Sequence, residues 1–283
     1  MSRKLLSLAI VLLIVCVPLV VLFVCTGAGY AGGPPGFEGA NPSDQAEEAI
    51  DAHKPITPGG KYERLVFIHY AKGGIPGPPD KGEDPSEDPS EEPPDVDNDY
   101  YELLSTWWDV SVGSIPFLID LDYAPTGSIG EIMAGFDAWD DATNIELFDE
   151  PQPDSSAAPS TNTPDFVNTV SWRRIVPPSA IAVTFTWYNP STLKTVDCDV
   201  VMNTKHKWGI DEDGEGTVFV LEGAFDVCNI FTHEAGHVVG LADLYDESYR
   251  ELTMFGYGSK GETQKISLED GDKWGCQELY DLP

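Results

Sequence analysis

The stretch from His233 to Asp243 reads HEAGHVVGLAD, and its spacing sets the expectations for the rest of the chain. His233 and His237 are four residues apart, so on a helix both imidazoles project from one face, one turn apart. Two nitrogens in this arrangement are suited to bind one zinc ion. Glu234 lies beside them, where its carboxylate can take a proton from a zinc-bound water and later pass it to a leaving amine.

A third protein ligand is needed, because a catalytic zinc ion is held by three protein ligands and keeps a further position open. Gly240 follows His237 by three residues and allows the chain to turn sharply off the helix end with a positive φ. Asp243 comes three residues later, so we expect it to return to the metal. The alternative is a solvated loop acid, since other acids follow closely. The histidines outside the motif all lie upstream of it: His53, His69 and His206.

The chain around this motif alternates between helical and strand patterns. We expect helices over residues 128–139, 226–240 and 267–280, the first from its apolar spacing of three and four and the second from a cap at Asp226. Strand patterns occur at residues 115–121, 145–148, 181–188 and 195–202. This order predicts an α+β domain with one mixed sheet.

The last of these strand patterns has a regular alternation. Asp197 and Asp199 alternate with apolar residues that run from Val196 to Met202. Successive side chains of a strand point to opposite faces of the sheet. The pattern therefore predicts one buried face and one face in contact with water.

The motif at 233–243 resembles the extended zinc motif of the metzincins, with Asp243 in the last ligand position, where most members have His. An Asp there is known from the snapalysin type. Metzincins also have a methionine turn beneath the zinc, and residues 252–256, LTMFG, are similar to it. The resemblance implies that His233, His237 and Asp243 bind Zn²⁺, and that Gly240 and Met254 support the site.

Weaker similarities extend this resemblance over about residues 100–283 and favour the matrixins among the metzincins. Residues 129–148 are similar to the first helix and following strand of matrixins, residues 199–203 to their edge strand, and residues 267–280 to their C-terminal helix. The resemblance implies a metzincin-like catalytic domain, with a twisted mixed β-sheet, an active-site helix and a C-terminal helix. It also implies a cleft in which the substrate adds a strand to the sheet edge.

The sequence departs from the matrixin pattern in three ways. No cysteine lies between Thr26 and Asp197, so the propeptide cysteine that keeps many matrixins inactive is absent. Tyr257 comes three residues after Met254, whereas some metzincins place a Tyr two residues after the turn to assist the transition state. The histidines for the second zinc ion of matrixins are missing.

Composition divides the chain into three parts. We expect residues 1–31 to be a signal peptide or an N-terminal membrane anchor, and residues 100–283 to form the zinc metallopeptidase domain that the resemblance implies. Residues 32–99 are low in complexity and rich in Pro, Gly and acids, which is typical of a linker or a pro-segment. This middle part contains one short strand pattern, at residues 65–68, which we expect to be isolated.

The N-terminal segment has the order of an export signal. Arg3 and Lys4 precede an apolar run over residues 5–25, and small residues follow at 26–31, where a signal peptidase can cut. The run is also long enough to cross a bilayer, so it either is cleaved or remains as an anchor. Both alternatives place the rest of the chain outside the cell. We expect an extracellular protein that contacts membranes only through this segment.

The charge is strongly acidic, with 16 Lys+Arg against 48 Asp+Glu and a formal net charge of −32. Such a surface repels nucleic-acid phosphates and anionic lipids, so we exclude both as partners. The acidic turn at residues 211–214 is either a Ca²⁺ site or a group of solvated acids. Cys228 and Cys276 either form a disulfide or stay as buried thiols.

These features together predict an exported zinc-dependent endopeptidase that acts as a monomer on a protein or peptide substrate. Glu234 is its expected general base, and no organic cofactor is expected. One alternative is an inactive zinc-binding surface or adhesive protein, which would have no use for Glu234. The other is a metallopeptidase of the thermolysin kind, which would take its third ligand from a later glutamate such as Glu262.

Overall fold

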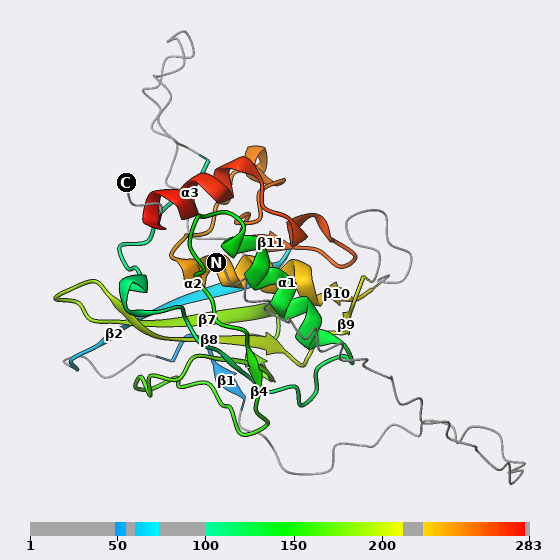
Figure 1. The fold of residues 1–283 in the computed structure, drawn as a ribbon. Helices are drawn as coiled ribbons and strands as arrows, with labels where there is room; N and C mark the ends of the chain where they lie inside the picture. Colours follow the sequence, from blue (N-terminus) through cyan, green and yellow to red (C-terminus); the bar gives the residue numbers. More distant parts are fainter. Residues whose placement is uncertain (1–48, 55–59, 74–99, 212–222, 281–283) are drawn as a thin grey trace, which may run out of the picture. The chain divides into compact units, whose positions relative to one another are not determined.

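The computed structural model describes residues 49–54, 60–73, 100–211 and 223–280. Its described part belongs to one compact unit, Ala46–Pro283, and is built on a seven-stranded mixed sheet of order β11-β2-β7-β8-β5-β3-β4 (Figure 1). The strands of this sheet are β2 (Glu63–Ala71), β3 (Leu118–Ile119), β4 (Gln152–Pro153), β5 (Thr169–Arg173), β7 (Ala180–Tyr188), β8 (Thr195–Asn203) and β11 (Tyr257–Gly258). Two small parallel pairs join β1 (Ile50–Asp51) to β6 (Ile175–Val176) and β9 (Trp208–Gly209) to β10 (Phe225–Asp226).

Strand directions make the sheet mixed, so the predicted α+β class with one main mixed sheet is confirmed. β8 pairs in parallel with β5 and antiparallel with β7, and β2 pairs antiparallel with β7 on its other side. The similarity of residues 199–203 to an edge strand is wrong in this respect, because they belong to β8 and have neighbours on both sides. Local pattern does not reveal how many neighbours a strand has.

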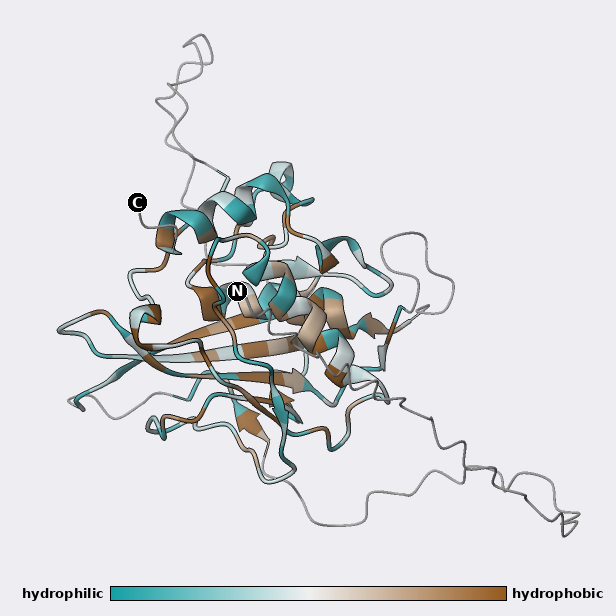
Figure 2. Cartoon of the chain, in the orientation of Figure 1, coloured by the Kyte–Doolittle hydropathy of each residue, from teal (hydrophilic) through white to brown (hydrophobic). Residues whose placement is uncertain are grey.

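Three α-helices occur in the described residues, at the three predicted places: α1 (Ser128–Asp140), α2 (Val227–Val239) and α3 (Asp270–Tyr280). Figure 1 shows α1 and α2 on one side of the sheet. The Asp226 carboxylate accepts a hydrogen bond from the backbone N–H of Asn229 at 2.7 Å, as the predicted cap of α2 should. Apolar residues gather along the central strands and on α2, where the main core lies (Figure 2).

The compact unit begins earlier than the boundary expected at residue 100. The strand pattern at 65–68 lies within β2, and β2 is paired with β7 over Glu63–Tyr70 instead of being isolated. The low-complexity sequence between β2 and Tyr100 concealed this long-range pairing. Residues 1–31, the whole segment 74–99 and all of the acidic turn except Asp211 lie outside the described residues, and with them lie the expected export segment and the expected calcium site. No helix among the described residues is both long and apolar enough to cross a membrane.

The predicted wet face of β8 is buried. Asp197 and Asp199 are both 0% exposed. The Asp197 carboxylate accepts backbone N–H bonds from Asp165 and Phe166, and the Asp199 carboxylate accepts one from Ser160. The loop that precedes β5 therefore covers this face, and the two carboxylates accept hydrogen bonds from backbone N–H groups of that loop. The alternating pattern of β8 alone does not predict that another segment covers it.

Replacing Asp199 by Asn should stabilise the protein increasingly as the pH rises. Burial, reinforced by Asp197, raises the pKa of Asp199 to about 8 from its ordinary 3.8. The unfolded chain therefore loses this proton near pH 4 while the folded chain keeps it, so the wild type loses stability as the pH rises toward 8. The amide cannot ionise and escapes this loss. We expect the unfolding free energy of Asp199→Asn minus that of the wild type to be constant below about pH 4. This difference should rise by a few kcal/mol by about pH 8.

Denaturant titrations of both proteins across this pH range would measure the difference. Asp137→Asn, at an exposed position on α1, serves as the control and should show no such trend. A difference in unfolding free energy for Asp199→Asn that does not vary with pH would contradict the raised pKa of Asp199.

Candidate metal centre

Three side chains meet beside the C-terminal half of α2. The Nε2 atoms of His233 and His237 lie 3.1 and 3.5 Å from Oδ1 of Asp243. These residues form one of two described groups whose ligand atoms all lie close enough together to hold a metal ion. The structure thus brings together the three ligands expected from the sequence.

Local chain geometry explains how Asp243 reaches the histidines. Gly240 ends α2 with φ 122°, a conformation that side-chain-bearing residues rarely adopt. The N–H groups of Gly240 and Leu241 both donate to the carbonyl of Gly236, which tightens the turn. The chain then leaves the helix axis and returns Asp243 to the face that carries both imidazoles.

Backbone carbonyls fix the orientation of both imidazoles. Nδ1 of His233 lies 2.7 Å from the carbonyl oxygen of Thr253, and Nδ1 of His237 lies 2.9 Å from that of Leu241. A carbonyl oxygen only accepts hydrogen bonds, so each Nδ1 carries the proton and each Nε2 presents its lone pair. This is the usual way in which a metal-binding histidine is held by a partner behind it.

The donor atoms fit a zinc ion. The Nε2 atoms of His233 and His237 and Oδ1 of Asp243 are all buried without a hydrogen-bond partner. Two lone pairs and a carboxylate oxygen that face one another repel unless a positive charge lies between them. Ligand atoms about 2 Å from a tetrahedral zinc ion are about 3.3 Å from one another. The separations of 3.1 and 3.5 Å from Asp243 lie on either side of this value.

Asp243 is kept ionised and oriented. Burial raises the pKa of Asp243, but positive charge on the facing imidazoles of His237 and His233 outweighs burial and holds this pKa well below its ordinary value. With both imidazoles neutral, a metal ion between them would supply that positive charge instead. The Tyr245 hydroxyl donates to Oδ2 at 3.0 Å, which leaves Oδ1 directed at the histidines. Burial and the charge of Asp243 raise the pKa of Tyr245, so the phenol stays protonated and remains a donor.

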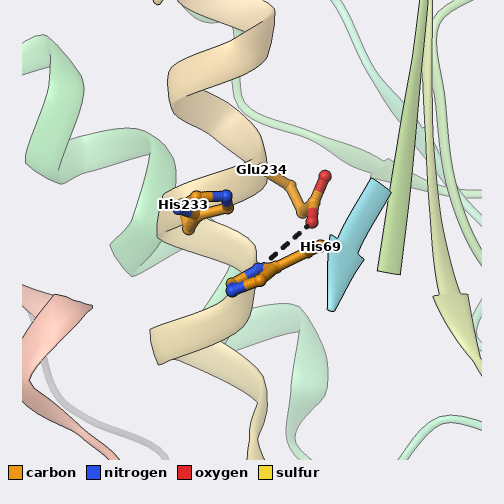
Figure 3. A group of neighbouring side chains, drawn as sticks. All are labelled: His69, His233 and Glu234. Carbon is orange, nitrogen blue, oxygen red and sulfur yellow. Dashed lines mark ion pairs between the residues drawn. The ribbon is translucent and has the colours of Figure 1, made fainter. Parts of the chain in front are cut away.

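Glu234 lies next to the ligand cluster with one oxygen held and the other without a hydrogen-bond partner. Oε2 accepts a hydrogen bond from the Thr184 hydroxyl of β7 at 2.5 Å, while Oε1 lies 3.5 Å from Nδ1 of His69 (Figure 3). Burial raises the pKa of Glu234 to about 7. A carboxylate with this pKa can take and release a proton near neutral pH.

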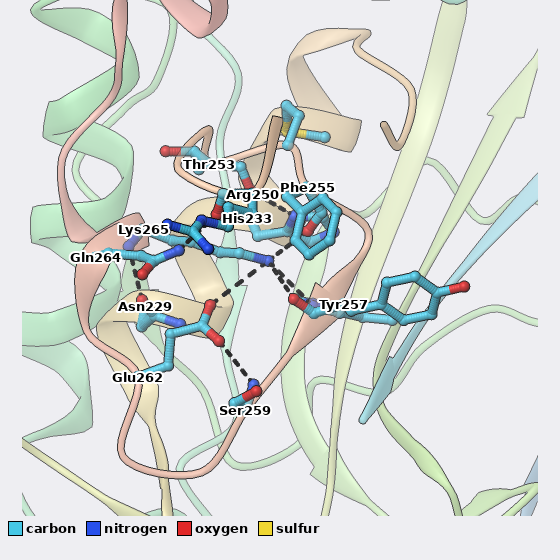
Figure 4. Close-up of polar contacts among 12 residues, drawn as sticks. Asn229, His233, Arg250, Thr253, Phe255, Tyr257, Ser259, Glu262, Gln264 and Lys265 are labelled. Carbon is cyan, nitrogen blue, oxygen red and sulfur yellow. Dashed lines mark hydrogen bonds and ion pairs between the residues drawn. The ribbon is translucent and has the colours of Figure 1, made fainter. Parts of the chain in front are cut away.

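His69 and Lys265 were not anticipated as part of the site. His69 comes from β2 and forms, with His233 and Glu234, the second described group that could hold a metal ion. Lys265 is 0% exposed and donates to the carbonyls of Phe255 and Tyr257 (Figure 4). Its Nζ lies 3.4 Å from Nε2 of His69. Only the pairing of distant segments brings these residues to α2, so the sequence carried no signal for them.

Met254 packs beneath α2 as the methionine-turn similarity implies. A side chain at Gly236 would come within 2.2 Å of the Met254 sulfur, so glycine there permits the close contact. Asp272 of α3 holds the turn from behind, because its carboxylate accepts the backbone N–H groups of Thr253 and Met254. The same turn supplies the carbonyl that orients His233, so its packing bears directly on the cluster.

Glu262 does not join either described metal-binding group. Its carboxylate accepts the backbone N–H of Ser259 and lies 3.8 Å from Nζ of Lys265. Cys228 and Cys276 are buried thiols that form no disulfide, which is the second of their two alternatives, and Cys198 is likewise buried without a disulfide. No protein-family model matches the chain, and a comparison with curated proteins finds no match. The function is therefore inferred from the site itself.

Proposed function

We propose that the chain is a zinc-dependent endopeptidase of the metzincin type. The observation that carries this proposal is the group of three buried, unpaired donor atoms on His233, His237 and Asp243, with Glu234 adjacent. Two imidazoles and one carboxylate are a ligand set typical of catalytic zinc. The methionine turn below α2 and the mixed sheet beside it support the finer assignment to a metzincin-like fold with matrixin-like elements.

Each residue of the site has a separate task in this proposal. A zinc ion held there supplies Lewis acidity, which polarises a carbonyl and makes water easier to deprotonate. Oε1 of Glu234 takes the proton of the attacking water and later gives it to the leaving amine. Thr184 holds Oε2 of Glu234, so that Oε1 is the oxygen left to exchange the proton.

The cellular setting follows from the sequence and belongs to the same proposal. The N-terminal segment exports the chain, which then acts outside the cell either free or anchored. The strongly acidic charge argues against nucleic acid as a partner, and the proposed chemistry requires a protein or peptide substrate. We propose that the protein is a monomer. A Ca²⁺ site at the acidic turn of residues 211–214 has less support than the zinc site.

The zinc content of purified residues 34–283 tests the proposal most directly. Native mass spectrometry should find one zinc ion per chain, and a chelator should remove it. His237→Ala should lose the ion, while the control His206→Ala, whose half-buried imidazole contacts a carbonyl elsewhere, should keep it. A protein that stays zinc-free after reconstitution at neutral pH would remove the basis of the peptidase proposal.

A further inference from the structure

The candidate metal centre is almost closed to solvent, and among its ligands only Asp243 is partly exposed. His233 and Glu234 are 0% exposed and His237 is 1% exposed. Two side chains of β2 lie against these residues. The ring of Phe67 stacks on that of His237 with centroids 4.3 Å apart, and the ring centroids of His69 and His233 are 3.9 Å apart. A site that acts on peptides must admit a chain to these atoms, so the described state is a closed one.

β2 fills a strand position between two other strands. On one side it pairs antiparallel with β7 from Glu63 to Tyr70. On the other side Tyr70 and Ala71 pair in parallel with β11, and the N–H of Lys72 donates to the carbonyl of Gly258 at 2.9 Å. β7 carries Thr184, which holds Glu234, and β11 follows the methionine turn. Removing β2 would therefore uncover two backbone edges that flank the metal centre.

The side chains of β2 divide between the two faces of the sheet. Val66 and Ile68 pack against the smaller apolar cluster, which includes Val183 and Phe185 of β7. Phe67 and His69 point the other way, toward α2. This is the alternation of any bound extended peptide, with every second side chain directed into the site.

His69 is 0% exposed, so the space that it fills would become a pocket if β2 left, and this pocket would have a polar end. Its neighbours include the Gly258 backbone and Ile181, since a side chain on Gly258 would lie 3.0 Å from Nε2 of His69 and 2.9 Å from Ile181. Lys265 lies at the end of the pocket, with Nζ 3.4 Å from Nε2 of His69. An ammonium group only donates, so this pocket suits a side chain whose tip accepts a hydrogen bond.

The segment that contains β2 is joined to the rest of the unit only through residues 74–99. Those residues are rich in Pro, Asp and Glu in the sequence. Everything else that builds the centre, including α2, β7 and β11, comes after Tyr100. A single cut in residues 74–99 would therefore turn the preceding segment, which carries β2 and also β1, into a separate peptide.

We propose that residues 60–73 are an internal occupant of the substrate position: β2 lies where an extended peptide binds between β7 and β11, with His69 in the pocket that selects a side chain with an acceptor tip. This inference rests on the proposed peptidase function. The closed chain is inactive, and departure of β2 opens the groove. Backbone pairing to β7 supplies affinity for substrate, and Lys265 determines specificity.

A controlled cut tests the proposal in the zinc-loaded chain of residues 34–283. A recognition sequence for a specific protease is inserted between Gly82 and Glu83, and a control chain carries it between Gly39 and Ala40, upstream of the compact unit. Three readouts follow: retention of the fragment on size exclusion, the rate at which a chelator removes zinc, and cleavage of unfolded casein. The first two require no turnover.

Cutting at the inner site should release the fragment. The rate of zinc removal and the rate of casein cleavage should then each rise by roughly 10- to 100-fold, because the fraction of molecules in the open state limits both rates. Cutting the control chain should change none of them. Phe67→Ala/His69→Ala in the uncut chain should shift zinc removal and cleavage in the same direction. Added in trans, a synthetic peptide of residues 60–73 should inhibit the opened enzyme, and its His69→Leu version should inhibit about tenfold less, because leucine offers no acceptor to the Nζ of Lys265, which lies 3.4 Å from Nε2 of His69.

Three results would overturn the proposal. The first is release of the fragment with zinc removal and cleavage unchanged. The second is a fragment that stays bound even when the cut chain carries Phe67→Ala/His69→Ala. The third is a loss of cleavage in His69→Ala with zinc removal unchanged, which would make His69 a positioning residue for Glu234. If zinc becomes accessible after the cut and no peptide is ever cleaved, the occupant proposal stands and the peptidase function fails.

Discussion

Glu234→Gln should leave zinc bound and remove most of the peptidase activity of the opened enzyme. The amide has nearly the same shape as the carboxylate and can still meet the Thr184 hydroxyl, which lies 2.5 Å from Oε2. It cannot take a proton from water, however, and general acid–base catalysis of this kind contributes about 10²- to 10⁴-fold to rates. We expect the turnover number to fall by at least this factor, with little change in KM, because Glu234 acts on the attacking water and not on substrate binding.

The measurement needs a control for the loss of one negative charge from a strongly acidic chain. Glu146→Gln provides it, because Glu146 is exposed and far along the sequence from the ligand cluster. Zinc content and turnover are measured for both variants. Activity of Glu234→Gln equal to that of Glu146→Gln, with zinc present in both, would rule out Glu234 as the general base and would favour an inactive zinc-binding protein.

Local geometry is what made much of the site predictable. The helical repeat alone places His233 and His237 on one face, and Gly240 is where the chain must adopt φ 122° to leave the helix. The cap at Asp226 and the extents of β7 and β8 also agree with the sequence patterns. In each case the signal and the structure lie within a few residues of each other, so no knowledge of distant contacts is required.

Contacts between distant segments account for what the sequence did not predict. β2 looked isolated because its partner strand begins more than a hundred residues later, beyond an acidic low-complexity stretch. Asp199 looked solvated because nothing in β8 reveals that a loop covers it. Lys265 follows the turn by eleven residues and becomes part of the site only because β11 folds back beside β2. A local sequence pattern describes a single helix or strand. The pairing of β2, the burial of Asp199 and the position of Lys265 each depend on contacts between two segments.

Asp243→Ala should weaken zinc binding more than any change behind the ligands. Oδ1 of Asp243 lies 3.1 and 3.5 Å from the two imidazole nitrogens and is the only carboxylate oxygen in that described group. Its removal leaves two ligands for an ion that requires three. Loss of a partner behind a ligand costs about 10- to 100-fold in metal affinity, and loss of the ligand itself should exceed this. Tyr245→Phe, which removes only the hydrogen bond to Oδ2, should therefore fall within that smaller range.

Zinc competition with a chelator at fixed pH would rank these variants, and the pH must be held because protons compete with zinc for the imidazoles. Glu262→Ala is the decisive comparison. Glu262 contacts Ser259 and Lys265, so its loss should leave zinc affinity unchanged if Asp243 is the third ligand. The opposite pattern, with zinc retained in Asp243→Ala and lost in Glu262→Ala, would identify Glu262 as the third zinc ligand. The short turn after Gly240 would then have no part in metal binding, and the metzincin assignment would fall with it.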